Sequence, residues 1–243
     1  MNYGLYTAFL GMRSRQRTLD SLANNIANAS TTGFKAERLN YETFEAANKG
    51  KGDKQSLIAG VSTSGATDFS AGSITQTGRS LDIAIEGDAF LSIQTPNGVR
   101  YTRAGNLKID ANGQLSTARG DLVIGDNGPI TVPPGGEVSI GTDGSLAVGN
   151  SQFDRLKLVR FDNPAGALIK EGDSLFMATG AGQPLEPASP GVVQGSLEGS
   201  NVNSISEMVA MINNNREFDS LQKSMSVLMN DIGRKVAGEI GRM

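Results

Sequence analysis

Apolar residues recur with heptad spacing at both ends of this 243-residue chain, and this pattern constrains the fold most strongly. The N-terminal stripe has one polar member, Gln16, and its apolar or small members are Leu5, Phe9, Met12, Leu19, Ala23 and Ile26. Alternating steps of four and three residues place these side chains on one side of an α-helix. The helix is predicted to end before Gly33, because the Asn-, Ser- and Thr-rich segment 28–32 competes for backbone hydrogen bonds.

A longer stripe of the same kind lies near the C-terminus. Its members are Met211, Asn214, Phe218, Leu221, Met225, Leu228 and Ile232. Ser204 and Glu207 have the spacing of a capping box, so a helix of about 30 residues is expected to begin near Ile205. An amphipathic helix of this kind has too little apolar surface to be stable alone in water. We therefore expect the two terminal helices to pair as a coiled-coil-like domain.

Each stripe contains one polar residue near its middle, Gln16 and Asn214. Two interpretations remain open at this stage. Both side chains could face solvent. Alternatively, a buried polar pair could penalise slipped pairings and so fix the register of the helices.

The middle of the chain predicts a mainly β domain. Ile83 and Ile85 alternate with polar or small residues, as in a half-buried strand. Residues 90–95 and 99–103 flank Pro96-Asn97-Gly98, which is a strong hairpin signal. The same turn chemistry recurs in segments 112–113, 126–128 and 143–144. Short strands separated by such turns are typical of an antiparallel sandwich or barrel-like fold.

Three regions follow from these patterns. Residues 1–35 and 203–243 are predicted to form a helical assembly domain, and residues 81–202 a β-rich domain. Residues 36–80 are expected to be an extended connector that contains a Gly- and Lys-rich loop at 48–55. We also expect an extended loop at 184–190.

Composition argues against an enzyme and against nucleic-acid binding. The chain has no His and no Cys, so the usual general base, zinc ligands and disulfides are missing. The net charge is −3, but residues 1–35 carry +3 and residues 203–243 carry zero, which leaves −6 on the middle. An acidic body is unsuited to phosphate backbones. No apolar run is long enough to span a membrane, and the arginines follow the apolar N-terminus, which is not the order of a cleaved signal peptide.

Three sequence blocks carry a resemblance to a known family. Residues 22–35, LANNIANASTTGFK, resemble the N-terminal signature of flagellar rod, hook and hook-associated proteins. Residues 200–203, SNVN, followed by EMV at 207–209 and MI at 211–212, resemble their C-terminal signature. Between these lie GDAF at 87–90, YTRAG at 101–105 and NGQL at 112–115, which are similar to the central domain of the rod and hook members.

The resemblance implies a structural role. Members of this family are exported unfolded by the flagellar type III apparatus and polymerise into the hollow axial structure, with the terminal helices inside and the β domain outside. The implied partners are copies of the chain, other rod and hook proteins and the export apparatus, with no cofactor, metal, catalytic residue, nucleic acid or membrane insertion. The implied location is the periplasmic rod of the basal body. The short chain favours a proximal-rod protein, with a distal-rod or hook-type subunit as the alternative.

Residues in and between the two helical stripes are the candidates for the assembly interface. They are Leu5, Phe9, Met12, Leu19, Asn24, Asn25, Ile26, Asn28, Gly33, Phe34, Met211, Asn214, Phe218, Leu221, Met225, Leu228 and Ile232. Asn24, Asn25 and Asn28 are poor helix formers, so their amides are predicted to bind the next subunit. The amides of residues 213–215 are predicted to do the same or to line the channel.

Two other functional classes fit the sequence less well. A cell-wall glycosidase could use Glu86 with Asp88, or Glu171 with Asp173, as its pair of carboxylates. Neither pair is accompanied by an aromatic platform for sugar. A secreted adhesin-like β protein would explain the middle of the chain but not the heptad pattern at its two ends.

Overall fold

The computed structural model describes residues 3–46, 57–187 and 191–240. The chain forms two compact units, each built from separate stretches of sequence. Unit 1 consists of residues 1–27, 37–66 and 203–243, and unit 2 consists of residues 28–36 and 67–202. The prediction of a separate connector at 36–80 is not tested, but the described part of this range contains strands.

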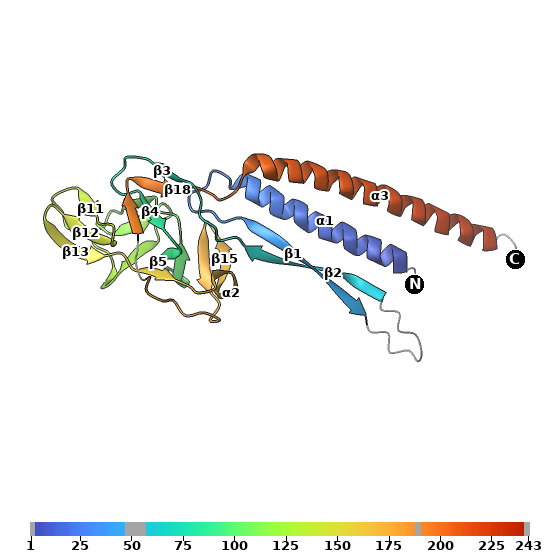
Figure 1. The fold of residues 1–243 in the computed structure, drawn as a ribbon, viewed down its shortest axis with the longest axis horizontal. Helices are drawn as coiled ribbons and strands as arrows, with labels where there is room; N and C mark the ends of the chain where they lie inside the picture. The colour runs from blue at the N-terminus through green and yellow to red at the C-terminus, as the bar shows by residue number, and fades with distance from the viewer. Residues whose placement is uncertain (1–2, 47–56, 188–190, 241–243) are drawn as a thin grey trace. The chain divides into compact units, whose positions relative to one another are not determined.

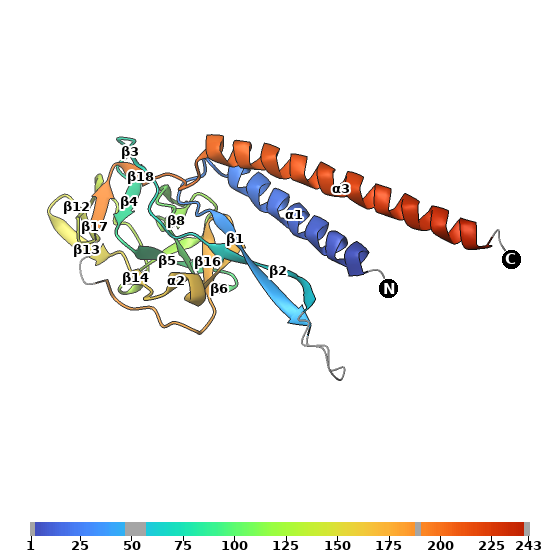
Figure 2. The ribbon, with the colours of Figure 1, turned by 45° about the vertical axis from the view of Figure 1, so that its right-hand side comes forward.

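Unit 1 contains the two long helices and a β-ribbon. Its elements are α1 (Tyr3–Ala27), β1 (Glu37–Ala46), β2 (Leu57–Thr67) and α3 (Ser204–Ile240). In Figures 1 and 2, α1 and α3 lie side by side, and β1 and β2 pair beside them. The helices run in opposite directions, because Asn25 contacts Glu207 whereas Arg15 contacts Asn214. Both terminal helices are therefore present where the heptad stripes predict them. The 48–55 loop lies outside the described residues.

The N-terminal end of α3 differs from the prediction. The predicted capping box used Ser204 and Glu207, but the cap is made by Asn203. Its side-chain oxygen accepts a hydrogen bond from Ser206 N at 3.1 Å, and its carbonyl accepts one from Glu207 N at 3.0 Å. Asparagine is among the best N-cap residues, because its short side chain reaches the unpaired N–H groups of the first turn. The Glu207 carboxylate is therefore not needed for the cap, and it contacts the side chain of Asn25 instead.

Unit 2 is built from short strands and one helical turn. The strands are β3 (Ile74–Gln76), β4 (Ile83–Glu86), β5 (Ala89–Thr95), β6 (Gly98–Thr102), β7 (Leu107–Ile109), β8 (Leu115–Thr117), β9 (Leu122–Gly125), β10 (Gly128–Pro129), β11 (Val138–Ile140), β12 (Ser145–Val148), β13 (Ser151–Arg155), β14 (Leu158–Arg160), β15 (Leu168–Gly172), β16 (Leu175–Ala178), β17 (Gly191–Gln194) and β18 (Ser196–Glu198). The helical turn is α2 (Pro164–Ala167).

The largest sheet has nine strands in the order β15-β16-β6-β5-β9-β8-β7, with β10 on β9 and β14 on β5. A three-stranded sheet, β11-β12-β13, and two pairs, β17-β4 and β18-β3, complete unit 2. The resolved registers within unit 2 are antiparallel, as predicted. Among the described residues the sheets do not close into a barrel.

The turns of unit 2 confirm the sequence signals. Thr95 pairs with Gly98 across Pro96-Asn97, so the predicted hairpin is β5-β6. The Asp110 side chain accepts hydrogen bonds from the backbone of Asn112 and Gln114 at the next turn. Gly113 in this turn has a φ of +77°, a conformation that other residues rarely adopt. Segments 126–128 and 143–144 likewise separate strands.

Two apolar clusters form the core of unit 2. The larger contains Ile83, Leu91 and Leu115 and extends to the β11-β12-β13 sheet. The second contains Phe90, Phe161 and Phe176, and Phe69 packs against it with its ring centroid 5.1 Å from that of Phe176. These aromatic rings meet at tilted and edge-on angles, which suits their quadrupoles. Ile83 and Ile85, whose alternation predicts a strand, both belong to the larger cluster. The alternating apolar residues therefore mark the side of the strand that faces the core.

Candidate assembly site

The described C-terminal stripe lies on the less exposed side of α3, and its Asn214 contacts α1. Asn214 is 4% exposed, and Met211, Phe218, Leu221 and Met225 are half-buried, whereas the residues between them are exposed. Asn214 donates to Arg15 O at 2.9 Å and accepts from the Arg15 guanidinium at 3.4 Å. Arg15 also forms an ion pair with Glu217 at 2.7 Å. The Arg15 side chain, which contacts both Asn214 and Glu217, favours this register of the two helices.

The N-terminal stripe is only partly buried. Met12, Leu19 and Ile26 are half-buried, but Phe9 is 53% exposed, and Gln16 and Ala23 are also exposed. Gln16 instead donates to Asp20 on the same helix. Of the two interpretations left open, solvent exposure holds for Gln16, whereas Asn214 is buried and binds Arg15 instead of Gln16. The heptad stripe misplaces the buried side of α1. The helix contacts both α3 and β1, so its buried residues do not follow a single stripe.

Asn25 of α1 contacts two other elements of unit 1, β1 and α3. Its amide nitrogen donates to Glu37 O at 2.9 Å, and its oxygen accepts from Glu37 N, also at 2.9 Å. The same nitrogen lies 3.4 Å from a carboxylate oxygen of Glu207. The amide thus pairs with β1 as a neighbouring strand would, and it also contacts α3. At 2% exposure Asn25 makes its hydrogen bonds within the chain, so its predicted contact with another subunit stays a prediction.

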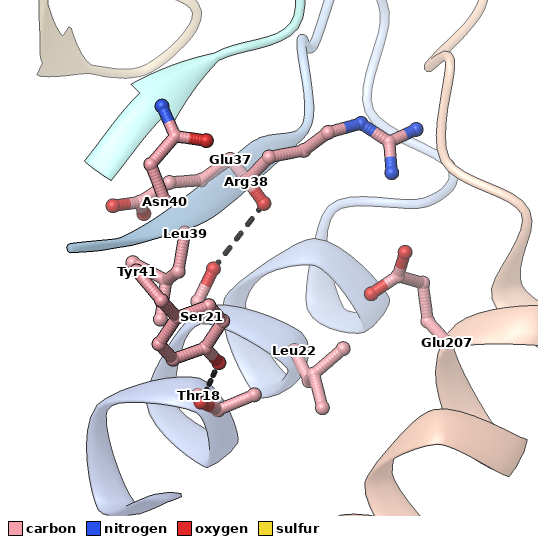
Figure 3. Close-up of a pocket in the computed structure, with 9 residues that line it drawn as sticks. All are labelled: Thr18, Ser21, Leu22, Glu37, Arg38, Leu39, Asn40, Tyr41 and Glu207. Carbon is pink, nitrogen blue, oxygen red and sulfur yellow. Dashed lines mark hydrogen bonds between the residues drawn. The ribbon is translucent and has the colours of Figure 1, made fainter. Parts of the chain in front are cut away.

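A hollow of about 270 Å³ lies beside this junction, between α1, β1 and the start of α3. Figure 3 shows Leu22 and Glu207 on its walls, with the Tyr41 hydroxyl against Thr18 and the Ser21 hydroxyl against the Glu37 carbonyl. Its lining is mixed, with two carboxylates, an arginine, hydroxyls and aliphatic side chains. Among the described residues no group of His, Cys, Asp and Glu is arranged to hold a metal ion.

The first turns of α3 present an apolar patch to solvent. We call it the α3 patch, and it consists of Ile205, Met208, Val209 and Ile212, which are between 48% and 74% exposed. These residues follow one another at steps of three, one and three, so they share one side of the helix. Met211 and Asn214, which face α1, lie on a different side. Further along α3, Val227 and Met229 are also exposed.

A buried ion cluster in unit 2 joins the three signature blocks of the sequence. It consists of Lys35, Arg103 and Glu198, each at most 2% exposed. Lys35 Nζ lies 2.6 Å from Glu198 Oε1, and Arg103 Nη1 lies 3.2 Å from Glu198 Oε2. Sequence analysis missed this cluster because its members are far apart in the chain. The sequence signal that could have indicated the cluster is that Lys35 and Arg103 lie inside two signature blocks and Glu198 lies just before the third.

Backbone groups complete the cluster. Lys35 also donates to Ser70 O at 2.7 Å, and Arg103 donates to Ile85 O and Gly87 O at 3.1 and 2.6 Å. Glu198 accepts from Gly72 N at 2.9 Å. Burial lowers the pKa of the Lys35 amine from 10.5, while its hydrogen bond to Glu198 opposes that shift. Burial lowers the pKa of Arg103 as well, against the pull of Glu198.

Gly33 and Phe34, both predicted assembly residues, are buried in unit 2 beside this cluster. Gly33 has a φ of +65°, and a Cβ there would lie 2.4 Å from Ala104 N. Only glycine tolerates both conditions. The Lys170 amine lies 3.5 Å above the centroid of the Phe34 ring. Within the chain these two residues therefore serve the packing of unit 2.

The remaining predicted residues divide by exposure. Asn24 is exposed and Asn28 is half-buried, with its side-chain oxygen accepting from the Thr31 hydroxyl at 3.2 Å. The side chains of Leu5, Leu228 and Ile232 lie outside the described residues, although all three positions belong to α1 or α3.

The Glu171–Asp173 pair considered for glycosidase chemistry is not arranged as an acid and a base. Glu171 is paired with Arg100, and Asp173 is paired with Arg119. The hydrogen bond from Arg100 lowers the pKa of Glu171, whereas a general acid needs a raised value. In the part of the chain that the structure describes, no helix is long and apolar enough to cross a membrane.

Three family patterns match the chain in the order expected from the signature blocks. Residues 5–35 match "Flagella basal body rod protein", residues 84–148 match "Flagellar hook protein FlgE/F/G D1 domain", and residues 193–228 match "Flagellar basal body rod FlgEFG protein C-terminal". The flagellar basal-body rod protein FlgF of Caulobacter vibrioides is 35% identical, with all of both chains covered. This chain belongs to the flagellar basal-body rod protein family.

Other members of the rod family show similar identity. FlgF of Escherichia coli is 35% identical over 96% of this chain and 97% of its own. FlgG of Bacillus subtilis is 36% identical over 90% of this chain and 92% of its own. The resemblance to flagellar rod proteins that the sequence blocks predict is confirmed by these FlgF and FlgG relatives. As a rod-family protein the chain is a structural protein of the flagellar basal body and not an enzyme.

Proposed function

We propose that this chain is a subunit of the proximal rod that polymerises into the hollow axial drive shaft. The flagellar type III apparatus exports it in our proposal, and copies of the chain and other rod and hook proteins are its partners in the periplasmic part of the basal body. The observation that carries the proposal is the α3 patch. It leaves four large apolar side chains exposed on a helix that already packs against α1.

Exposed apolar side chains gathered on one face usually mark a protein interface. In this proposal the two sides of α3 contact different partners. The side with Asn214 pairs with α1 of the same chain in a coiled-coil-like manner, and the α3 patch binds another subunit. Phe9 on the exposed side of α1 supplies a second apolar contact. Because these surfaces differ, the contact is heterologous and can repeat along a helix instead of closing into a ring.

The proximal assignment is supported by the FlgF relatives, and the FlgG relatives keep the distal rod as the alternative. The experiment is electron microscopy of basal bodies from a strain that lacks this gene. We expect rods that are missing or truncated at the membrane-proximal end, and restored by the intact gene. Truncation at the hook end would assign the chain to the distal rod, and complete rods would contradict the proposal.

A further inference from the structure

The last residues of unit 2, 191–201, complete its structure from several sides, and we call them the closing segment. Its strand β17 pairs with β4, and Gly191 lies opposite Glu86. Its strand β18 pairs with β3, and Glu198 lies opposite Ile74. All other strands of unit 2 precede it in the chain.

The closing segment carries the carboxylate of the ion cluster. Glu198 binds both Lys35 and Arg103, and its backbone carbonyl accepts from Gly33 N at 2.8 Å. Asp68 and Asp88 also act on these cations electrostatically, but Glu198 is the carboxylate that contacts both of them directly. Removing the contacting partner of a buried charge strongly opposes folding. The position of Glu198 therefore ties direct ion pairing of Lys35 and Arg103 to docking of the closing segment.

Two side-chain amides extend the same arrangement. The Asn201 oxygen accepts from Ala36 N at 2.7 Å, and its nitrogen donates to Asp68 O at 2.8 Å. The Gln194 nitrogen donates to Ser80 O and Val138 O at 2.7 and 2.8 Å. The closing segment therefore satisfies backbone groups on separate stretches of unit 2, which would otherwise be left unpaired.

These contacts join residues that are distant in sequence. Lys35 and Glu198 are 163 positions apart, and Arg103 and Glu198 are 95 apart. The β5-β6 hairpin is closed instead by a two-residue turn. Loop-closure entropy makes distant pairings form after local ones. Docking of the closing segment is thus expected to be a late step.

We infer that docking of the closing segment is a folding switch: unit 2 stays open until residues 191–201 dock and bring the Glu198 carboxylate against Lys35 and Arg103. During synthesis, all the other strands of unit 2 are made before the two strands of the closing segment, β17 and β18. Unit 2 consequently stays open until the end of its own sequence is available. The inference concerns folding alone and holds whether or not the proposed polymerisation is correct.

The equilibrium test uses the full chain with Glu198→Gln, and Asp173→Asn, which removes the exposed ion pair with Arg119, is the matched control. We expect Glu198→Gln to lower the folding equilibrium constant of unit 2 by roughly a hundredfold or more, and the control to change it little. Adding Lys35→Met should recover part of this loss, because one uncompensated cation is removed. Equal stability of the Glu198→Gln variant and the control, or no recovery in the double variant, would overturn the ion-pairing step.

The kinetic test separates a switch from a merely stabilising network. Asn201→Ala and Val192→Ala remove contacts of the closing segment, and Ile93→Val removes a methyl group from the β5-β6 hairpin. The gain of hydrogen-exchange protection in β5 and β6 reports the folding of unit 2. We expect the first two substitutions to act mainly on the unfolding rate, whereas Ile93→Val slows refolding in proportion to its effect on stability. Refolding slowed in that proportion by Asn201→Ala and Val192→Ala would show early docking and overturn the inference.

Discussion

The side-chain amide of Asn25 binds both backbone groups of Glu37, at 2.9 Å in each direction. A helix residue thereby supplies β1 with the pair of hydrogen bonds that a neighbouring strand would give. Signature asparagines invite an interpretation as contacts between subunits. Asn25 instead holds α1 and β1 together within one chain.

Replacing Asn25 by Asp should therefore destabilise unit 1. The carboxylate cannot donate to Glu37 O, and it lies beside Glu207. We expect a loss of about 1–3 kcal/mol, the usual result when a buried hydrogen-bonding group loses its partner. Hydrogen exchange at Glu37 N measures it. The matched control is Asn215→Asp at an exposed position of α3, which should leave this protection unchanged. Equal effects of the two substitutions would contradict the role given to Asn25.

A close backbone approach at Gly33 gives a second prediction. Gly33→Ala places a Cβ against Ala104 N and Arg103 C, and it also forces a left-handed φ. Gly149→Ala is the control, since Gly149 has a similar φ of +60° but its Cβ would meet nothing within 4 Å. The control should cost about 1–2 kcal/mol from backbone strain alone. Thermal unfolding should show a clearly larger loss for Gly33→Ala, and equal losses would show that the close approach is unimportant.

Glu171 gives a pH dependence with a definite sign. The hydrogen bond from Arg100 holds its folded pKa below the ordinary value of 4.5, so the folded state binds fewer protons than the unfolded state between those two values. This contribution to stability is present above pH 4.5 and is lost as pH falls through the folded pKa. Urea unfolding between pH 5 and pH 3 should therefore show a smaller decline for Glu171→Gln than for the unchanged chain. Parallel declines would mean that the Arg100 pair does not contribute.

The sequence predicts the elements of this fold better than their faces. Turn residues such as Asn97-Gly98 define hairpins because their chemistry is local. Phe9 shows the limit of the helical pattern, since heptad spacing identifies an apolar stripe but not which neighbour covers it. The α3 stripe is predicted more accurately, because Asn214 is buried against Arg15 of α1 and Met211 and Phe218 are half-buried beside exposed neighbours.

Local sequence patterns do not predict the ion cluster, because its residues are far apart in the chain. Lys35 and Arg103 stand in blocks that look like separate signatures, and Glu198 comes just before a third. Only the paired strands of unit 2 bring these charges together. The buried amide of Asn214 was predictable as a polar residue in an apolar stripe, but its partner was not, because Arg15 binds it through a backbone carbonyl that any residue could offer.

The most direct test of the account is Val209→Asp in the α3 patch, expressed as the only copy in cells that lack the native gene. Val209 is 54% exposed in the single chain, so a carboxylate there should leave the thermal unfolding of the monomer unchanged. In a packed interface the same carboxylate is buried without a partner, which costs several kcal/mol at every subunit. Ser220→Asp, at an exposed polar position of α3, is the control. We predict that basal bodies from the Val209→Asp cells lack the subunit and that the cells do not swim, whereas the control cells swim. Normal rods containing the Val209→Asp chain would contradict assembly through the α3 patch.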